Sequence, residues 1–175
     1  MTEDQTLLNP ASSLAALLAA PMRPGLVAWI GLRPVRREPL LAMPHADLDP
    51  ADGLRGDHYG NHTTRTRQVT LMQTEHLGAI AAYLGRDFIE PALLRRNILV
   101  SGINLRALIK QEFRLGSAVL LATGECHPCS RMEKLLGPGG YNAVRGHGGI
   151  TARILGRGRV QLGDEIARLD SMALP

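Results

Sequence analysis

Short apolar segments, separated by clusters of glycine, proline and polar residues, follow one another along most of the chain. Apolar runs bounded by turn residues in this way are typical of β-strands. The pattern predicts strands over residues 26–32, 68–72, 97–100 and 117–123. Two further runs, 150–155 and 159–166, alternate apolar and polar positions on either side of Gly156-Arg-Gly158, which predicts a β-hairpin.

Helical spacing is confined to brief segments with clear ends. Residues 74–84 carry Glu75 in the first turn and stop at Gly85. Residues 130–136 stop at Gly137-Pro-Gly-Gly, and residues 104–110 predict a short helix capped by Asn104. Many short strands with only brief helices indicate a mainly β fold. We expect a closed β-barrel of short strands with short peripheral helices.

The N-terminal part of the chain differs from the rest. An Ala/Leu-rich segment predicts a small helix over residues 11–20, with Asn9 as its N-cap and Pro10 at its first position. We expect a helical appendage in residues 1–25 and one β-rich domain over residues 26–170. Within that domain, residues 45–60 are rich in Asp, Gly and Pro and predict a long polar loop, which in a compact domain is usually functional.

Composition narrows the class of protein. Apolar residues make up 45% of the chain, enough for a core, but aromatic residues only 3%, which argues against a partner of single-stranded nucleic acid. The apolar stretch 15–21 is far shorter than the ~20 residues that span a bilayer. The acidic start Met1-Thr-Glu-Asp does not resemble an export signal. We therefore expect a cytoplasmic protein with no membrane partner.

The net charge of +4 comes almost entirely from arginine, since lysine occurs only at Lys110 and Lys134. A GC-rich genome explains such a bias without any function. Alternatively, guanidinium groups serve an anionic ligand, because their planar fork of donors matches phosphate and carboxylate. The arginines are spread along the sequence rather than clustered. An anion site therefore has to be argued from particular arginines rather than from the net charge.

Chemistry is concentrated in Thr123-Gly-Glu-Cys126-His-Pro-Cys129-Ser-Arg131-Met, between an apolar strand and a short helix. A thiolate at a helix N-terminus is stabilised by the helix dipole and by unpaired backbone N–H groups. His127 and Arg131 add positive charge nearby. We expect Cys129 to be a nucleophile, a metal ligand or both.

Other interpretations of the two cysteines stay open. The cysteines could instead be two structural thiols or form a small disulfide loop. They could also be a redox pair of the thioredoxin type, or part of a zinc site completed by His58 or His147. The redox pair needs a long helix after the second cysteine, whereas Gly137-Pro-Gly-Gly cuts this one short. The zinc site needs four ligands, and no second cysteine pair exists.

Several weaker motifs gain meaning from their order, which resembles that of the MOSC family, named for the C-terminal domain of molybdenum-cofactor sulfurase. The resemblance covers residues 26–169. Its matching elements are, in order, Gly53-Leu-x-Gly-Asp57-His58, Arg67-Gln-Val, Arg95-x-Asn97-Ile, Gly102-x-x-Leu105, Leu115-Gly-x-Ala118, Cys126-x-x-Cys129, Gly148-Gly-Ile and Gly163-Asp164.

The resemblance implies a closed β-barrel and a site for molybdenum cofactor, an anionic pterin. In amidoxime-reducing members the second cysteine of Cys-x-x-Cys holds molybdenum, which corresponds to Cys129, while Arg-x-Asn corresponds to Arg95 and Asn97 near the pterin. With them, Arg67 and Asp57 are expected at the cofactor, and His58 as a catalytic group that orients substrate or moves a proton. The glycines around His147 let the backbone approach a ligand, or simply form a turn.

Three functions therefore remain for comparison. One is a molybdenum-dependent reductase of N-hydroxylated compounds. The second is a carrier that holds sulfur on Cys129 as a persulfide for metal–sulfur cofactor assembly. In the family's sulfurases a pyridoxal-phosphate cysteine-desulfurase domain supplies this sulfur, and no such domain is evident here. We therefore expect a separate sulfur donor or electron-transfer protein as partner. The third is a non-catalytic binding module with structural cysteines.

Overall fold

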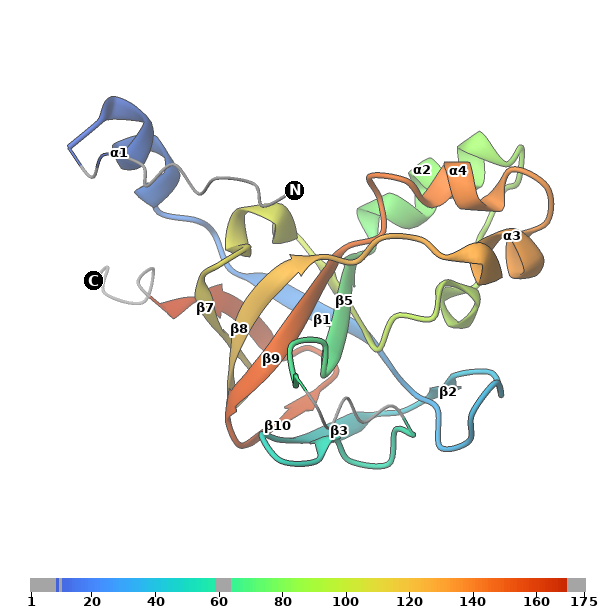
Figure 1. Ribbon diagram of the computed structural model, residues 1–175, viewed down its shortest axis with the longest axis horizontal. Helices are drawn as coiled ribbons and strands as arrows, with labels where there is room; N and C mark the ends of the chain where they lie inside the picture. Colours follow the sequence, from blue (N-terminus) through green and yellow to red (C-terminus); the bar gives the residue numbers. More distant parts are fainter. Residues whose placement is uncertain (1–8, 10, 59–63, 170–175) are drawn as a thin grey trace.

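A closed barrel of seven strands forms the body of the protein (Figure 1). The computed structural model describes residues 9, 11–58 and 64–169. Around the barrel the strands run in the order β11, β7, β8, β9, β5, β6 and β1, and the β1–β11 pairing closes the circle. Among the barrel strands of the described residues, β5 and β6 form the one parallel pair and the other pairs are antiparallel. The mainly β fold with a closed barrel, expected from the sequence, is confirmed.

Five of the barrel strands, β1, β5, β6, β8 and β9, lie on apolar runs that were predicted as strands, whereas β7 was not predicted and β11 overlaps only the end of the run 159–166. Their interior positions are filled by aliphatic side chains with almost no exposed surface, including Ile30, Leu71 and Ile154. Removing such side chains from water is the main source of folding free energy. The bounds are β1 Gly25–Leu32, β5 Val69–Gln73, β6 Ile98–Ser101, β7 Glu112–Leu115, β8 Ala118–Glu125, β9 Ile150–Gly156 and β11 Glu165–Arg168.

A small second sheet closes one end of the barrel, in the order β10, β3, β4. It consists of β3 His45–Asp49, β4 Gly53–Leu54 and β10 Gly158–Gln161, while β2 Leu41–Ala42 pairs with the end of β1. The segment predicted as a long polar loop therefore contains two short strands, and its last two residues, 59 and 60, lie outside the described residues.

The predicted hairpin between residues 150–155 and 159–166 is wrong. β10 pairs with β3 instead, and β11 pairs with β1 and β7. The chain leaves the barrel after β9, where Arg157 forms an ion pair of 2.7 Å with the buried carboxylate of Asp49 at the end of β3. This ion pair joins the turn to the small sheet.

Four short helical segments pack together on one side of the barrel and enclose a second apolar core. Met72, Ile80, Leu94 and Leu136 are fully buried there. The bounds are α2 Glu75–Tyr83, the 3₁₀ turn η1 Pro91–Leu94, α3 Ser130–Leu136 and α4 Gly140–Val144, and a further 3₁₀ turn, η2 Leu105–Leu108, is capped by Asn104. The helices predicted over 74–84, 104–110 and 130–136 thus exist.

The N-terminal helix α1, Ser13–Ala19, stands apart from the other helices in Figure 1. Its N-cap is Ser12, which accepts a hydrogen bond from the Ala15 amide, so the predicted cap at Asn9 is wrong. Pro10 lies outside the described residues. The guanidinium of Arg168 on β11 donates to backbone carbonyls at the end of this helix and so attaches it to the barrel. No helix in the described part of the chain is long and apolar enough to cross a membrane.

Candidate functional site

The Cys126–Cys129 loop connects the end of β8 to the start of α3. The Cys126 amide donates to the Gly149 carbonyl, which holds the loop against the start of β9. Cys126 is buried and Cys129 is exposed, and both are free thiols. Of the two sulfurs, only that of Cys129 is open to a ligand.

Cys129 lines a cavity of about 260 Å³, which we call the thiol cavity. It brings together five of the six residues expected at the site, Asp57, Arg67, Arg95, Asn97 and Cys129, which are up to 72 positions apart (129 minus 57) in the chain. The remaining lining residues are Arg33, Leu40, Thr70, Arg96, Cys126, His127 and Met132.

The sixth expected residue, His58, is not among the residues that line this cavity. Its backbone amide donates to the Arg33 carbonyl at 2.7 Å. The Asp57 carboxylate accepts from the Arg33 amide at 2.7 Å. The Gly-Asp-His element thus fixes the backbone of Arg33 at the end of β1. The histidine among the lining residues is His127 instead.

Arg95 follows η1 and adopts a left-handed backbone with φ of 58°. L-residues other than Asn, Asp and Gly rarely adopt this conformation. Burial lowers the pKa of Arg95 below its ordinary value, and the positive charges of Arg33 and Arg131 lower it further. An anion bound beside these guanidinium groups would reduce their mutual repulsion.

Arg96 is a residue that the sequence interpretation missed. Its side chain is 95% buried (5% exposed) and donates to three backbone carbonyls, those of Leu94, Cys126 and Gly148, at 2.7 to 3.0 Å. No carboxylate in the described part of the chain forms an ion pair with it. A buried charge without a counter-charge is costly, so Arg96 adds an uncompensated positive charge behind the thiol. Neighbouring arginines look alike in sequence, and nothing there indicates which one turns inward.

The Asn97 side chain, expected at the cofactor, forms hydrogen bonds mainly within the protein. Its amide oxygen accepts from the backbone and hydroxyl of Thr70 on β5, and its amide nitrogen donates to the Gly31 carbonyl on β1. These bonds join the two strands beside β6. An amide nitrogen carries two hydrogens, so one hydrogen remains for a ligand.

Arg33 was also missed. Its Nε atom is buried and has no hydrogen-bond partner. Within residues 11–58 and 64–169, no carboxylate forms an ion pair with any of four arginines: Arg33, Arg67, Arg95 and Arg131. Buried donors normally have partners, so this orphaned Nε and the unpaired guanidinium groups around it fit an anionic ligand.

The Gly146-His-Gly-Gly149 loop approaches backbone rather than a ligand. A Cβ on Gly148 would lie 2.0 Å from the Cys126 carbonyl oxygen, and a Cβ on Gly149 would lie 1.9 Å from that of Leu71. Gly149 also has φ of 80°. Both glycines therefore support the Cys126 loop. The His147 ring packs edge-on against His76 at 4.8 Å, and burial followed by the charge of His76 lowers the pKa of His147.

Two other interpretations of the cysteines, the zinc site and the thioredoxin-type redox pair, gain no support. Among the described residues, no group of three or more His, Cys, Asp or Glu side chains could hold a metal ion, so the zinc site with His58 or His147 is not formed. The helix after Cys129 has seven residues and lies between antiparallel strands β8 and β9. A thioredoxin-type site needs a longer helix in a βαβ unit.

The MOSC domain family model matches residues 58–167, and a comparison with curated proteins finds no match. Among solved structures, YuaD from Bacillus subtilis is similar with a TM-score of 0.70 and 22% identity, over 82% of this chain and 94% of that one. YiiM from Escherichia coli has a TM-score of 0.66 and 16% identity, over 84% of this chain and 70% of that one. YiiM from Geobacillus stearothermophilus has a TM-score of 0.67 and 14% identity, over 83% of this chain and 75% of that one.

At these identities the solved structures establish the fold alone. The family match is independent of them and spans 110 residues (58 to 167 inclusive) of the 175. It includes the Arg-x-Asn element and both cysteines. The chain belongs to the MOSC domain family.

Proposed function

We propose that this MOSC domain binds molybdenum cofactor, with Cys129 as the protein's ligand to the metal, and reduces N-hydroxylated compounds. The observation that carries the proposal is the exposed Cys129 thiol on a cavity whose lining includes four arginines and a single carboxylate, that of Asp57. A thiolate is a soft ligand of the kind that soft metals select. Guanidinium groups match the geometry of a phosphate.

The residues present fit the group. The pterin carries a terminal phosphate and a dithiolene, so the protein needs to contribute one thiolate and a basic cradle rather than a cluster of metal ligands. Arg67, Arg95 and the free amide hydrogen of Asn97 would hold the pterin. The orphaned Arg33 Nε and the buried charge of Arg96 are the features that an anion would satisfy.

When bound, the cofactor supplies two-electron chemistry. Reduction of an N–OH group to N–H and water takes two electrons and two protons, with the electrons coming from a separate electron-transfer protein. In this chain, His127 is the histidine among the lining residues of the cavity, and we propose that its imidazole donates a proton to the departing hydroxyl. Asp57, bound to the Arg33 amide, would keep Arg33 oriented toward the ligand.

Metal analysis tests the proposal directly. Protein purified from a host that makes molybdenum cofactor should contain molybdenum and pterin in roughly equal amounts with the chain, and Cys129→Ser should reduce both to background. Cys126→Ala is the matched control: it removes the buried neighbouring thiol, should retain the metal, and should lower the free energy of unfolding by about 1–2 kcal/mol. Full molybdenum content in Cys129→Ser protein would exclude Cys129 as the ligand.

Sulfur transfer is the second candidate, favoured by the exposure of Cys129 while Cys126 is buried. In this reaction the Cys129 thiolate attacks the outer sulfur of a persulfide on a cysteine desulfurase. One S–S bond forms on Cys129, the donor's S–S bond breaks, and the donor leaves as a thiol. Mass spectrometry after incubation with desulfurase and cysteine should show one added sulfur on Cys129. No added sulfur, under conditions that load a known carrier, would exclude this function.

A further inference from the structure

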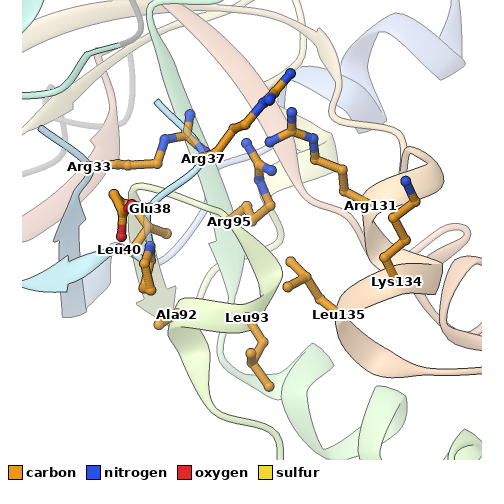
Figure 2. Close-up of a pocket in the computed structure, with 11 residues that line it drawn as sticks. Arg33, Arg37, Glu38, Leu40, Ala92, Leu93, Arg95, Arg131, Lys134 and Leu135 are labelled. Atoms are coloured by element: carbon orange, nitrogen blue, oxygen red, sulfur yellow. The ribbon is translucent and has the colours of Figure 1, made fainter. Parts of the chain in front are cut away.

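A second cavity, of about 540 Å³, adjoins the thiol cavity and shares Arg33, Leu40 and Arg95 with it (Figure 2). We call it the side cavity. Its volume lies within the range of small-molecule sites. It is formed between the segment after β1, the η1 turn and the outer face of α3. A compound in the side cavity would therefore contact residues that also line the cavity of Cys129.

The side cavity is lined by cationic side chains at one end and by apolar side chains at the other. Figure 2 shows the nitrogen-bearing ends of Arg33, Arg37, Arg95 and Arg131 gathered at one end, with the Lys134 ammonium to one side of them. The side chains of Leu40, Ala92, Leu93 and Leu135 line the other end.

Charge compensation inside the side cavity is incomplete. Glu38 is the only carboxylate among its lining residues, against the five cations. No ion pair within the described ranges joins Glu38 to any of them. The cationic end therefore favours an anion, and the apolar end disfavours one that is small and fully hydrated.

Two of the arginines occupy strained backbone. Arg37 has φ of 74° and Arg95 has φ of 58°. The left-handed conformation costs an L-residue roughly 1–2 kcal/mol, and glycine would adopt it without that cost. Strain of this kind concentrates at ligand sites, where the side chain is retained for binding. Both strained residues present their guanidinium groups to the same cavity.

We propose that the side cavity binds an amphipathic organic anion, with its charged group between Arg33, Arg37 and Arg95 and its apolar body against Leu93 and Leu135. The inference deepens the proposed function, because it identifies the class of substrate that would lie beside Cys129. Such a substrate carries a carboxylate or phosphate on an apolar body. Neutral compounds and small inorganic anions satisfy only one end of the cavity.

Isothermal titration of the full-length protein with octanoate tests this inference. Octanoate should bind, whereas acetate, which lacks the apolar body, and octanamide, which lacks the charge, should each bind at least 10-fold more weakly. Arg37→Gln should weaken octanoate binding at least 5-fold, and Arg36→Gln, the adjacent arginine that does not line the cavity, should leave it unchanged. Leu135→Gln should weaken octanoate binding similarly, and Leu162→Gln, which changes an exposed leucine outside the cavity, is its control.

The outcomes separate this inference from the proposed function. Cys129→Ser protein should bind octanoate as tightly as the wild type, since the thiol does not line the side cavity. Octanoate binding without any molybdenum in the purified protein would contradict the proposed function alone. Equal affinity for octanoate and octanamide, or equal effects of Arg37→Gln and Arg36→Gln, would overturn the inference. Loss of octanoate binding when cofactor is present would also overturn it, because the side cavity would then be part of the cofactor site.

Discussion

Replacing Arg96 with Met is expected to lower the free energy of unfolding by about 2–4 kcal/mol and to remove bound molybdenum. Arg96 donates to the carbonyls of Leu94, Cys126 and Gly148, which belong to three separate segments around the thiol cavity. An apolar side chain leaves these carbonyls unsatisfied, and a buried unsatisfied acceptor costs about 1–3 kcal/mol. Removal of the buried charge offsets part of this loss of stability, because a buried charge is itself destabilising. Urea unfolding measures the stability and metal analysis the occupancy.

Arg86→Met is the matched control for this change. Arg86 is also an arginine that donates to a backbone carbonyl, that of Leu136, but it is exposed. Its replacement should cost below about 1 kcal/mol and leave molybdenum content unchanged. A loss of stability in Arg96→Met no greater than in Arg86→Met would contradict the role assigned to the buried guanidinium.

The local structure was predictable where sequence signals are local. Helix α3 begins and ends where the sequence predicted, because Gly137-Pro-Gly-Gly cannot continue a helix. Strand β8 matches the apolar run 117–123 to within two residues. The partners of β10 and β11 were not predictable, because alternation shows which side chains face inward but not which strand lies alongside. Their placement depends on long-range contacts such as the Arg157–Asp49 ion pair.

In the candidate site, too, local features were predictable and long-range ones were not. Cys129 could be singled out because its spacing from Cys126 and the following helix are local features. Arg33 could not, because it approaches Arg95 only when β1 and β6 pair in the barrel. Arg96, whose side chain is buried, directly follows the left-handed backbone of Arg95, which no propensity of arginine predicts. The family motif identified the Arg-x-Asn element. Its middle residue, Arg96, is the one that hydrogen-bonds to three segments around the site.

Replacing Arg95 with Gly is expected to change stability and binding in opposite directions. Glycine adopts φ of 58° without the left-handed cost of roughly 1–2 kcal/mol, although it adds conformational entropy to the unfolded chain. The burial of the guanidinium and its repulsion by Arg33 and Arg131, which together lower the pKa of Arg95, are also removed. The free energy of unfolding should therefore rise by about 0.5–1 kcal/mol. Octanoate affinity should fall at least 10-fold and molybdenum content should drop, because the guanidinium lines both cavities.

Lys110→Gly separates the backbone effect from the loss of the side chain. Lys110 is an exposed cation with φ of 66°, and it lines neither cavity. Its replacement should stabilise the fold to a similar extent in urea unfolding while leaving octanoate affinity and molybdenum content unchanged. If Arg95→Gly destabilised the protein and Lys110→Gly did not, the Arg95 side chain would be part of the folding framework. If Arg95→Gly kept full binding, the strained arginine would have no ligand to hold, and the assignment of an anionic ligand to each cavity would lose its main support.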